Sequence, residues 1–382
     1  MNPARQAPSS SHTYTRLGRL LPYLERDPAN LPLLAEAATA AFDEHDFGLS
    51  AALIERYAAI APLSPTLTNL SGLVAMAQQK FGDAAQIFEQ LRRVGPDSPP
   101  LRFNLAWSKS MLGAYQEALD LLDDETIAES PFAPALKIQM MHRLQLYDDA
   151  LACGQALVER FPDDQALSGA LATLAMDAER PDLSRYYAER AGNNPEGRAA
   201  LGMLTLGEHD PDTALAIFED TITRDPNNAR AWLGKGLGLV ISGDAAGGAQ
   251  ALDQGAELFR VHLGSWVASG WAYYVNGDYA KSRARFERAV LIDANFAEGH
   301  GGLATLDVIE DKIDAARRRI EISLRLDKKC FGGALAKSLL LKRIGKEAAG
   351  KKVFDIALST PFGSGGQTIA QALVAFGKNL GR

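Results

Sequence analysis

The sequence has few of the features that organise many other classes of protein. It contains only two cysteines, Cys153 and Cys330, so a disulfide framework cannot hold the fold together. We expect both to be small, buried or half-buried side chains. No stretch approaches about 18 uninterrupted apolar residues, which argues against a membrane-spanning helix. The first eleven residues lack the apolar core of a secretory signal, and we therefore expect a cytoplasmic protein.

Patterns that would carry catalysis or bind a metal are also missing. No two of the six histidines lie four residues apart, and none lies near a cysteine, so metal-ligand spacing is absent. The segment 234–238 has the glycines of a phosphate loop, but it lies inside an expected helix with no strand before it. We predict that the chain is not an enzyme and that it holds no cofactor and no metal.

Charge is distributed unevenly along the chain. Its net charge is −7, with a hydrophobic fraction of 47% and a charged fraction of 23% that are ordinary for a folded protein. From residue 297 onward there are 15 Lys and Arg against 9 Asp and Glu, a net charge of +6. The preceding 296 residues hold 25 basic and 38 acidic residues, a net charge of −13. An acidic body with a basic end can steer partners or favour head-to-tail contacts.

A repeat of 34 residues runs through most of the chain. Trp232 and Trp266 are 34 residues apart, and the unit that follows the second is the clearest. Its marker residues are Trp266, Gly270, Tyr273, Tyr279, Ser282, Phe286 and Ala289. Steps of about this length define ten units.

Two positions in these units are reserved for small side chains. Position twenty is small in all ten units: Ser50, Ala84, Ala118, Ala150, Ser184, Ala214, Gly248, Ser282, Ala316 and Gly350. Position eight is small in nine, Ile138 being the exception. A large side chain at either place would hold two helix axes apart, which close packing does not tolerate.

The units resemble the tetratricopeptide repeat, in which Trp, Leu-Gly, Tyr, Ala, Phe and Pro recur at fixed offsets. The resemblance implies an all-α fold: a right-handed α-α superhelical solenoid of about ten helix pairs with terminal capping helices. We expect a disordered tail over 1–13, an N-terminal cap over 14–30, the solenoid over 31–362, and a linker with a C-terminal capping helix over 363–382. The repeats are predicted at 31–64, 65–98, 99–130, 131–164, 165–194, 195–228, 229–262, 263–296, 297–330 and 331–362.

The same resemblance places the first helix of each pair on the concave face. The side chains it turns inward are mostly apolar, and the predicted partner-binding groove consists of Met76, Phe103, Trp107, Met203, Leu237, Trp271 and Tyr274. Such a groove suits an amphipathic helix or an apolar peptide. Gly301 lies one repeat beyond Trp271 and is expected to open a pocket beside it. The alternative is that these side chains pack against the inner wall of the array itself.

A basic patch follows in the ninth repeat, formed by Arg317, Arg318, Arg319, Lys328 and Lys329. It is either a solvated helical face or a contact for an acidic partner. Nucleic acid is not expected, because aromatic residues for base stacking are missing nearby.

The sequence therefore predicts a protein-interaction scaffold or adaptor, or a chaperone-like protein, that binds a protein or peptide. An assembly factor for a secretion or cell-surface apparatus and the recognition arm of an enzyme complex are the alternatives.

Overall fold

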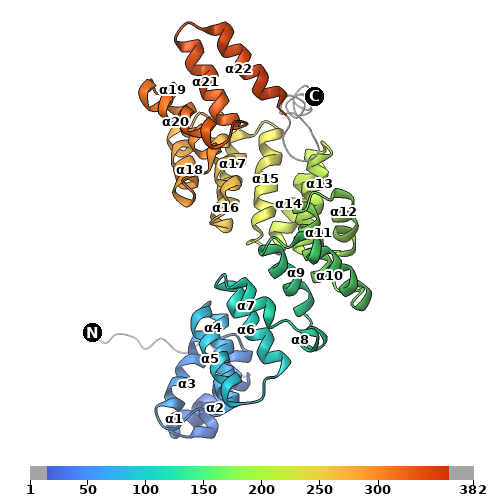
Figure 1. Ribbon diagram of the computed structural model, residues 1–382. Helices are drawn as coiled ribbons and strands as arrows, with labels where there is room; N and C mark the ends of the chain where they lie inside the picture. The colour runs from blue at the N-terminus through green and yellow to red at the C-terminus, as the bar shows by residue number, and fades with distance from the viewer. Residues whose placement is uncertain (1–14, 361–382) are drawn as a thin grey trace, which may run out of the picture. The chain divides into compact units, whose positions relative to one another are not determined.

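The computed structural model describes residues 15–360, and every regular element in that range is an α-helix. Figure 1 shows the helices in chain order. Their bounds are α1 Arg16–Arg26, α2 Leu31–Asp43, α3 Phe47–Ala58, α4 Pro65–Ala77, α5 Phe81–Val94, α6 Pro99–Met111, α7 Tyr115–Asp120, α8 Asp124–Glu129, α9 Ala133–Arg143, α10 Tyr147–Arg160, α11 Gln165–Asp177, α12 Pro181–Arg190, α13 Pro195–Gly207, α14 Pro211–Arg224, α15 Ala229–Ile241, α16 Ala245–Phe259, α17 Leu263–Val275, α18 Tyr279–Ile292, α19 Ala297–Ile309, α20 Ile313–Leu326, α21 Phe331–Arg343 and α22 Glu347–Ser359.

These helices form stacked antiparallel pairs, which confirms the predicted all-α solenoid. The chain divides into two compact units, residues 1–153 and 154–382, and the division falls inside α10. In the first unit α1 packs on α2, while in the second the pairs run from α11 and α12 to α21 and α22. The predicted N-terminal tail and C-terminal capping helix lie outside the described residues.

Short polar side chains begin many of the first helices. Ser64 accepts a hydrogen bond from the backbone N–H of Leu67 at 3.3 Å, and Pro65 follows as the first residue of α4. Asn194 caps α13 in the same way, again followed by a proline, Pro195. A cap satisfies a free N–H group of the first turn, and proline has no N–H to leave unpaired there. The starts of α4 and α13 are therefore defined by the local sequence.

Small residues bring the two helices of each pair together. The hydroxyl of Ser282 on α18 donates a hydrogen bond of 2.8 Å to the carbonyl of Gly270 on α17. Ser50 and Ala38 make the same contact at 2.8 Å in the first unit, as do Ser184 and Ala172 in the second. In each bond position twenty donates to position eight, so the two small positions lie directly opposite each other and fix the register of the pair.

A phenylalanine four residues further on fills the space between consecutive pairs. Phe286 is fully buried, and a Cβ atom built on Gly270 would lie 2.7 Å from its ring. A Cβ atom on Gly302, in the first helix of the next pair, would lie 2.5 Å from the same ring. The ring thus occupies the room that the missing side chains of two helices leave.

The third pair departs from the regular pattern. Its second helix is divided into two short helices, α7 and α8, and α9 then begins at Ala133. Asp123 starts α8 by accepting a hydrogen bond of 2.9 Å from the backbone N–H of Thr126. Leu122, at the break, is 1% exposed. A cap and a buried anchor therefore stabilise the interruption.

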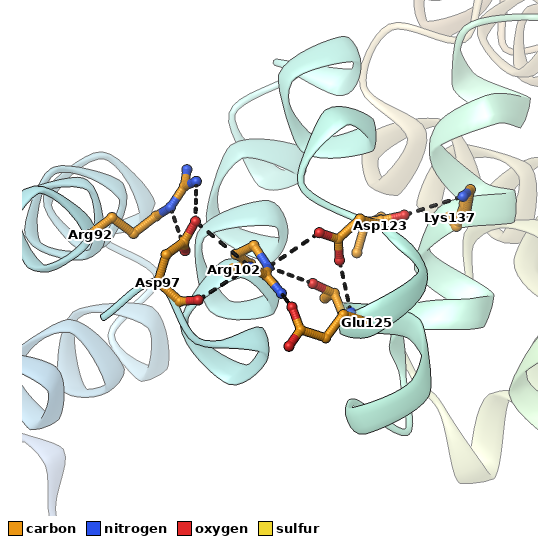
Figure 2. Close-up of polar contacts among 8 residues, drawn as sticks. Arg92, Asp97, Arg102, Asp123, Glu125 and Lys137 are labelled. Carbon is orange, nitrogen blue, oxygen red and sulfur yellow. Dashed lines mark hydrogen bonds and ion pairs between the residues drawn. The ribbon is translucent and has the colours of Figure 1, made fainter. Parts of the chain in front are cut away.

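A network of charges around Arg102 of α6 holds this break in place (Figure 2). The Arg102 guanidinium pairs with Glu125 and donates a hydrogen bond of 2.9 Å to the Thr126 hydroxyl. It also lies 3.6 Å from the Asp123 carboxylate and 3.8 Å from that of Asp97. One side chain of a first helix therefore ties α6 to the start of α8.

Helices α19 and α21 approach each other backbone to backbone. A Cβ atom on Gly301 would lie 2.5 Å from the nitrogen of Gly333 and 2.7 Å from the carbonyl carbon of Gly332. The carboxylate of Glu298, one turn earlier in α19, accepts hydrogen bonds from the backbone N–H groups of Phe331 and Gly332 at 2.6 and 3.1 Å. A side chain of one helix thus caps the other, and the glycines let it reach.

Gly301→Ala should lower the free energy of unfolding by about 1–3 kcal/mol, because the added methyl group meets backbone that cannot rotate away. The matched control is Gly207→Ala in α13, where an added Cβ atom meets nothing within 4 Å. That change should be neutral or stabilise by up to about 1 kcal/mol through helix propensity. Urea unfolding of both variants is the measurement. An equal effect at the two sites would contradict the close approach.

The charge network around Asp97 makes stability depend on pH. The hydrogen bond from Arg92 holds the pKa of the Asp97 carboxyl below its usual range, against the opposing effect of burial. The pKa of Asp97 is lower in the folded than in the unfolded state. The ionised carboxylate therefore stabilises the fold at pH values above the unfolded pKa, and this stabilisation is lost as the pH falls through the folded pKa.

Arg92→Gln should raise the pKa of Asp97 toward the ordinary range of an aspartate, because it removes the hydrogen bond that lowers this pKa most. The variant should therefore lose less stability on acidification than the wild type does. Carboxyl NMR titration and unfolding at several acidic pH values measure the two effects. Arg93→Gln removes the same charge from an exposed neighbour and should leave the Asp97 titration unchanged.

Candidate partner-binding surface

One face of α6 carries an exposed apolar stripe. Phe103, Trp107 and Met111 follow at four-residue spacing, which places them on one side of the helix. The ring centroids of Phe103 and Trp107 are 6.2 Å apart. Trp107 is 37% exposed, Met111 is 53% exposed and Phe103 is half-buried, while Leu105 on the opposite side is fully buried. The stripe is thus an apolar surface that the rest of the first unit does not cover.

The second tryptophan predicted for the groove, Trp271 of α17, is half-buried in an aromatic cluster. Its ring centroid lies 5.1 Å from that of Phe286 and 6.4 Å from that of Phe331, two pairs further along. Tyr274 lies 5.5 Å away on the same helix, and burial, followed by the nearby Tyr279, raises the pKa of its hydroxyl. These contacts give Trp271 and Tyr274 a packing role inside the array.

The pocket expected beside Trp271 is not there, so that prediction is wrong. Gly301 is buried against the backbone of Gly332 and Gly333, and the ring of Phe331 reaches Trp271. The sequence could not show this because α21 lies two helices away from α19 along the chain. The missing side chain serves the close contact of two helices rather than a cavity.

The other residues predicted for the groove are half-buried. Met203 of α13 and Leu237 of α15 both pack against the core cluster around Phe218. Met76 of α4 is also partly covered. Each presents part of its side chain to solvent, so these residues can supplement an anchor more readily than act as one.

The predicted basic patch contains side chains in two different states. Arg319 pairs with Asp307, a fully buried carboxylate that Arg283 also contacts at 2.8 Å. These arginines satisfy a buried charge and hold α18, α19 and α20 together. Of the remaining four residues, which are all exposed, Arg317 is 3.8 Å from Asp314 and the others form no ion pair with residues 15–360.

A cavity of about 470 Å³ lies between α20 and α21, next to Arg317. Its floor consists of the apolar side chains Ile320, Leu324, Leu340, Leu341 and Ile344. Its rim carries the charged side chains Arg317, Glu321, Arg325 and Lys337. A volume of this size is within the range of ligand sites in proteins.

Sequence reasoning missed Arg325, Lys337 and the apolar floor of this cavity. A signal was available in α20, where Arg317, Glu321 and Arg325 are spaced by four residues and therefore share a face. The pairing of that face with one side of α21 depends on packing, which the spacing does not reveal.

Comparison with known proteins agrees with this architecture. The tetratricopeptide repeat profile matches residues 35–99, 69–134 and 199–260. The chain belongs to the tetratricopeptide repeat family. No curated protein matches its sequence.

Solved structures share the fold at low sequence identity. An IFIT1 monomeric mutant with Gppp-AAAA is 11% identical, with a TM-score of 0.51 over 91% of this chain and 95% of that one. The human IFIT1 dimer with m7Gppp-AAAA is 13% identical, with a TM-score of 0.50 and the same coverage. The Cut9–Hcn1 tetramer of the APC/C is 13% identical, with a TM-score of 0.47 over 96% of this chain and 91% of that one. At these identities the likeness concerns the fold alone.

Tetratricopeptide arrays are in general scaffolds for protein interactions, and the architecture of this chain supports such a role. Within residues 15–360 there is no group of three or more His, Cys, Asp or Glu side chains that could hold a metal ion. In the same range, no helix combines the length and the apolar character needed to cross a bilayer.

The two cysteines of the tetratricopeptide array differ in environment. Cys330 is fully buried before α21, where its sulfur accepts a hydrogen bond of 3.3 Å from the N–H of Gly333. Burial, followed by the nearby Glu298, raises the pKa of the Cys330 thiol to about 12. Cys153 is partly exposed. Only the thiolate form reacts quickly, so the two should differ in reactivity.

In the folded protein, a disulfide reagent such as DTNB should modify Cys153 at least about tenfold faster than Cys330 near pH 8. Cys153→Ser should abolish the fast phase, and urea should restore reaction at Cys330. Rapid modification of folded Cys153→Ser protein would show that Cys330 is more accessible than described here.

Proposed function

We propose that this chain is a scaffold or adaptor, with a chaperone-like manner of binding, that holds an apolar partner segment against its first helices. The observation that carries the proposal is the apolar stripe on α6, in which Trp107 and Met111 are exposed and Phe103 is half-buried. An amphipathic helix or an extended apolar segment has the matching chemistry.

The stripe has the properties of an interaction anchor. Tryptophan is enriched among the residues that dominate binding energy, since it buries a large area at little cost in rotamer entropy. The helix that carries it is also held firmly, because Arg102 ties α6 to α8 through the network of Figure 2. A rigid support reduces the ordering cost of association.

Met76, on α4 of the same unit, is half-buried and extends the proposed surface. We place it at the periphery, where contacts exclude water but contribute little energy. The half-buried residues Met203, Leu237, Trp271 and Tyr274 belong to the second unit, and we propose them as contacts of that unit's own first helices. Whether each of them meets a partner stays a prediction.

The apolar character of the stripe favours a protein partner over nucleic acid. Base recognition in single strands needs aromatic platforms beside a basic track. The two cations of α6, Arg102 and Lys109, are held in ion pairs with glutamates. The exposed basic residues of α20 have no aromatic neighbours in that helix. The assembly-factor role, the enzyme-recognition role and the cytoplasmic location also stay predictions, as does the absence of catalysis.

Trp107→Ala should weaken partner binding by about 2 kcal/mol, or roughly 30-fold in Kd, because it removes the largest exposed apolar group of the stripe. Quantitative affinity capture with the full chain, followed by titration of the captured partner, measures the change. Circular dichroism should show unchanged helix content.

Tyr23→Ala is the matched control. Tyr23 of α1 is an aromatic residue of the same unit that is 60% exposed, and it lies outside the proposed surface. The Tyr23→Ala variant should bind the partner with an affinity within about twofold of the wild type, as expected outside a hot spot. Equal losses in the two variants, or loss of helix content in Trp107→Ala, would refute the assignment.

Trp271→Ala discriminates packing from binding, since a lower unfolding midpoint with unchanged affinity would indicate packing alone.

A further inference from the structure

The cavity between α20 and α21 has an apolar floor within a basic rim. We call it the basic groove, lined by Arg317, Ile320, Glu321, Leu324, Arg325, Lys337, Leu340, Leu341 and Ile344. Its lining runs over residues 317–325 of α20 and over residues 337–344, which comprise the end of α21 and the residue that follows it. At 1.5 Å per residue, each wall is about 10–12 Å long. This length accommodates about two turns of a helix.

The basic groove faces away from the side of α21 that corresponds to the predicted partner-binding groove. Leu339 marks that side, because it lies 68 residues, or two repeats, after Trp271. Successive residues turn by 100°, so Lys337, Leu341 and Ile344 lie on the side of the helix opposite Leu335 and Leu339. It is therefore a different surface from the one described for the first helices. Ile344 is 44% exposed at one end of the groove, so the apolar floor reaches solvent.

Two of the three cations of the rim have no acidic partner among residues 15–360, and the third has only one long, exposed ion pair. The side chains of Arg325 and Lys337 form no ion pair or hydrogen bond with any residue from 15 to 360, and Arg317 is 3.8 Å from Asp314. Nearby arginines behave differently: Arg343 pairs with Asp311 at 2.8 Å, and Arg319 pairs with Asp307. Among the lining side chains, three cations face a single carboxylate, that of Glu321.

We propose that the basic groove docks an acidic amphipathic helix of a partner protein. Leucine-like side chains on one face of that helix would fill the apolar floor, and carboxylates at its flanks would meet Arg317, Arg325 and Lys337. Charge complementarity selects the partner and accelerates encounter, while the apolar floor supplies the burial. The lining contains no aromatic ring, which disfavours single-stranded nucleic acid as the occupant.

The test uses the full chain and a synthetic, fluorescein-labelled helical peptide with leucines on one face and glutamates beside them. A scrambled peptide of the same composition and one with lysine in place of glutamate are the reference probes. Fluorescence anisotropy should show binding of the first peptide only. Binding should weaken as salt rises.

Two variants with the same change in charge give the decisive comparison. Arg325→Glu with Lys337→Glu should weaken binding at least about tenfold, whereas Lys328→Glu with Lys329→Glu, outside the lining, should change it less than about twofold. Ile344→Ser should also weaken binding, since it removes an exposed apolar side chain from the floor. Circular dichroism and urea unfolding establish that each variant is folded.

Several results would overturn the proposal: no binding of the acidic peptide, equal binding of the scrambled peptide, or equal losses in the two charge-reversal variants. If single-stranded RNA or anionic vesicles bind in a way that depends on Arg325 and Lys337 while the peptide does not bind, the groove is a site for that ligand and not for an acidic helix. Salt-sensitive self-association that depends on the same residues would assign the groove to a second copy of the chain. Trp107→Ala should not alter peptide affinity, so failure here leaves the α6 proposal standing.

Discussion

Close approach of the two helices within a pair is the constraint on which the rest of this structure depends. Where position twenty is serine, as in Ser50 and Ser282, its hydroxyl donates to the carbonyl of position eight across the pair. Where it is alanine, as in Ala84 and Ala214, the side chain is fully buried at the same place. Larger groups would separate the axes, and the phenylalanine that fills the space between pairs would lose its contacts.

This packing rule also decides what each first helix can show to a partner. One side of the helix is used by its own pair and by the neighbouring pairs, so only the remaining stripe is available for binding. In α6 that stripe keeps Trp107 and Met111 in solvent, whereas in α17 the ring of Trp271 meets Phe286 and Phe331. Equivalent positions thus differ in exposure because their neighbours differ in size and reach.

The basic side chains also fall into two groups, those paired with carboxylates inside the protein and those exposed without such a partner. Asp307 and Asp253 are acceptors for arginines on adjacent helices, with Arg283 and Arg319 serving the first and Arg285 the second. The pairs at Asp307 tie α18, α19 and α20 together, and the pair at Asp253 ties α16 to α18. Cations held in such pairs are not available for a role at the surface. Arg325 and Lys337, at the groove between α20 and α21, are not used in this way.

The all-helical class, the pairing of helices and the small residues that allow it can be predicted from the amino-acid sequence, because they depend on contacts that repeat every 34 residues within one or two helices. Helix starts such as Pro65 and Pro195 were equally readable, since capping is local. Three features could not be predicted in this way: Gly301 meets α21, Arg319 is paired while Arg325 is not, and the second helix of the third pair is divided. Those outcomes depend on which side chain of another helix packs at a given site. The 34-residue pattern does not specify this, because equivalent positions of all the repeats look alike in it.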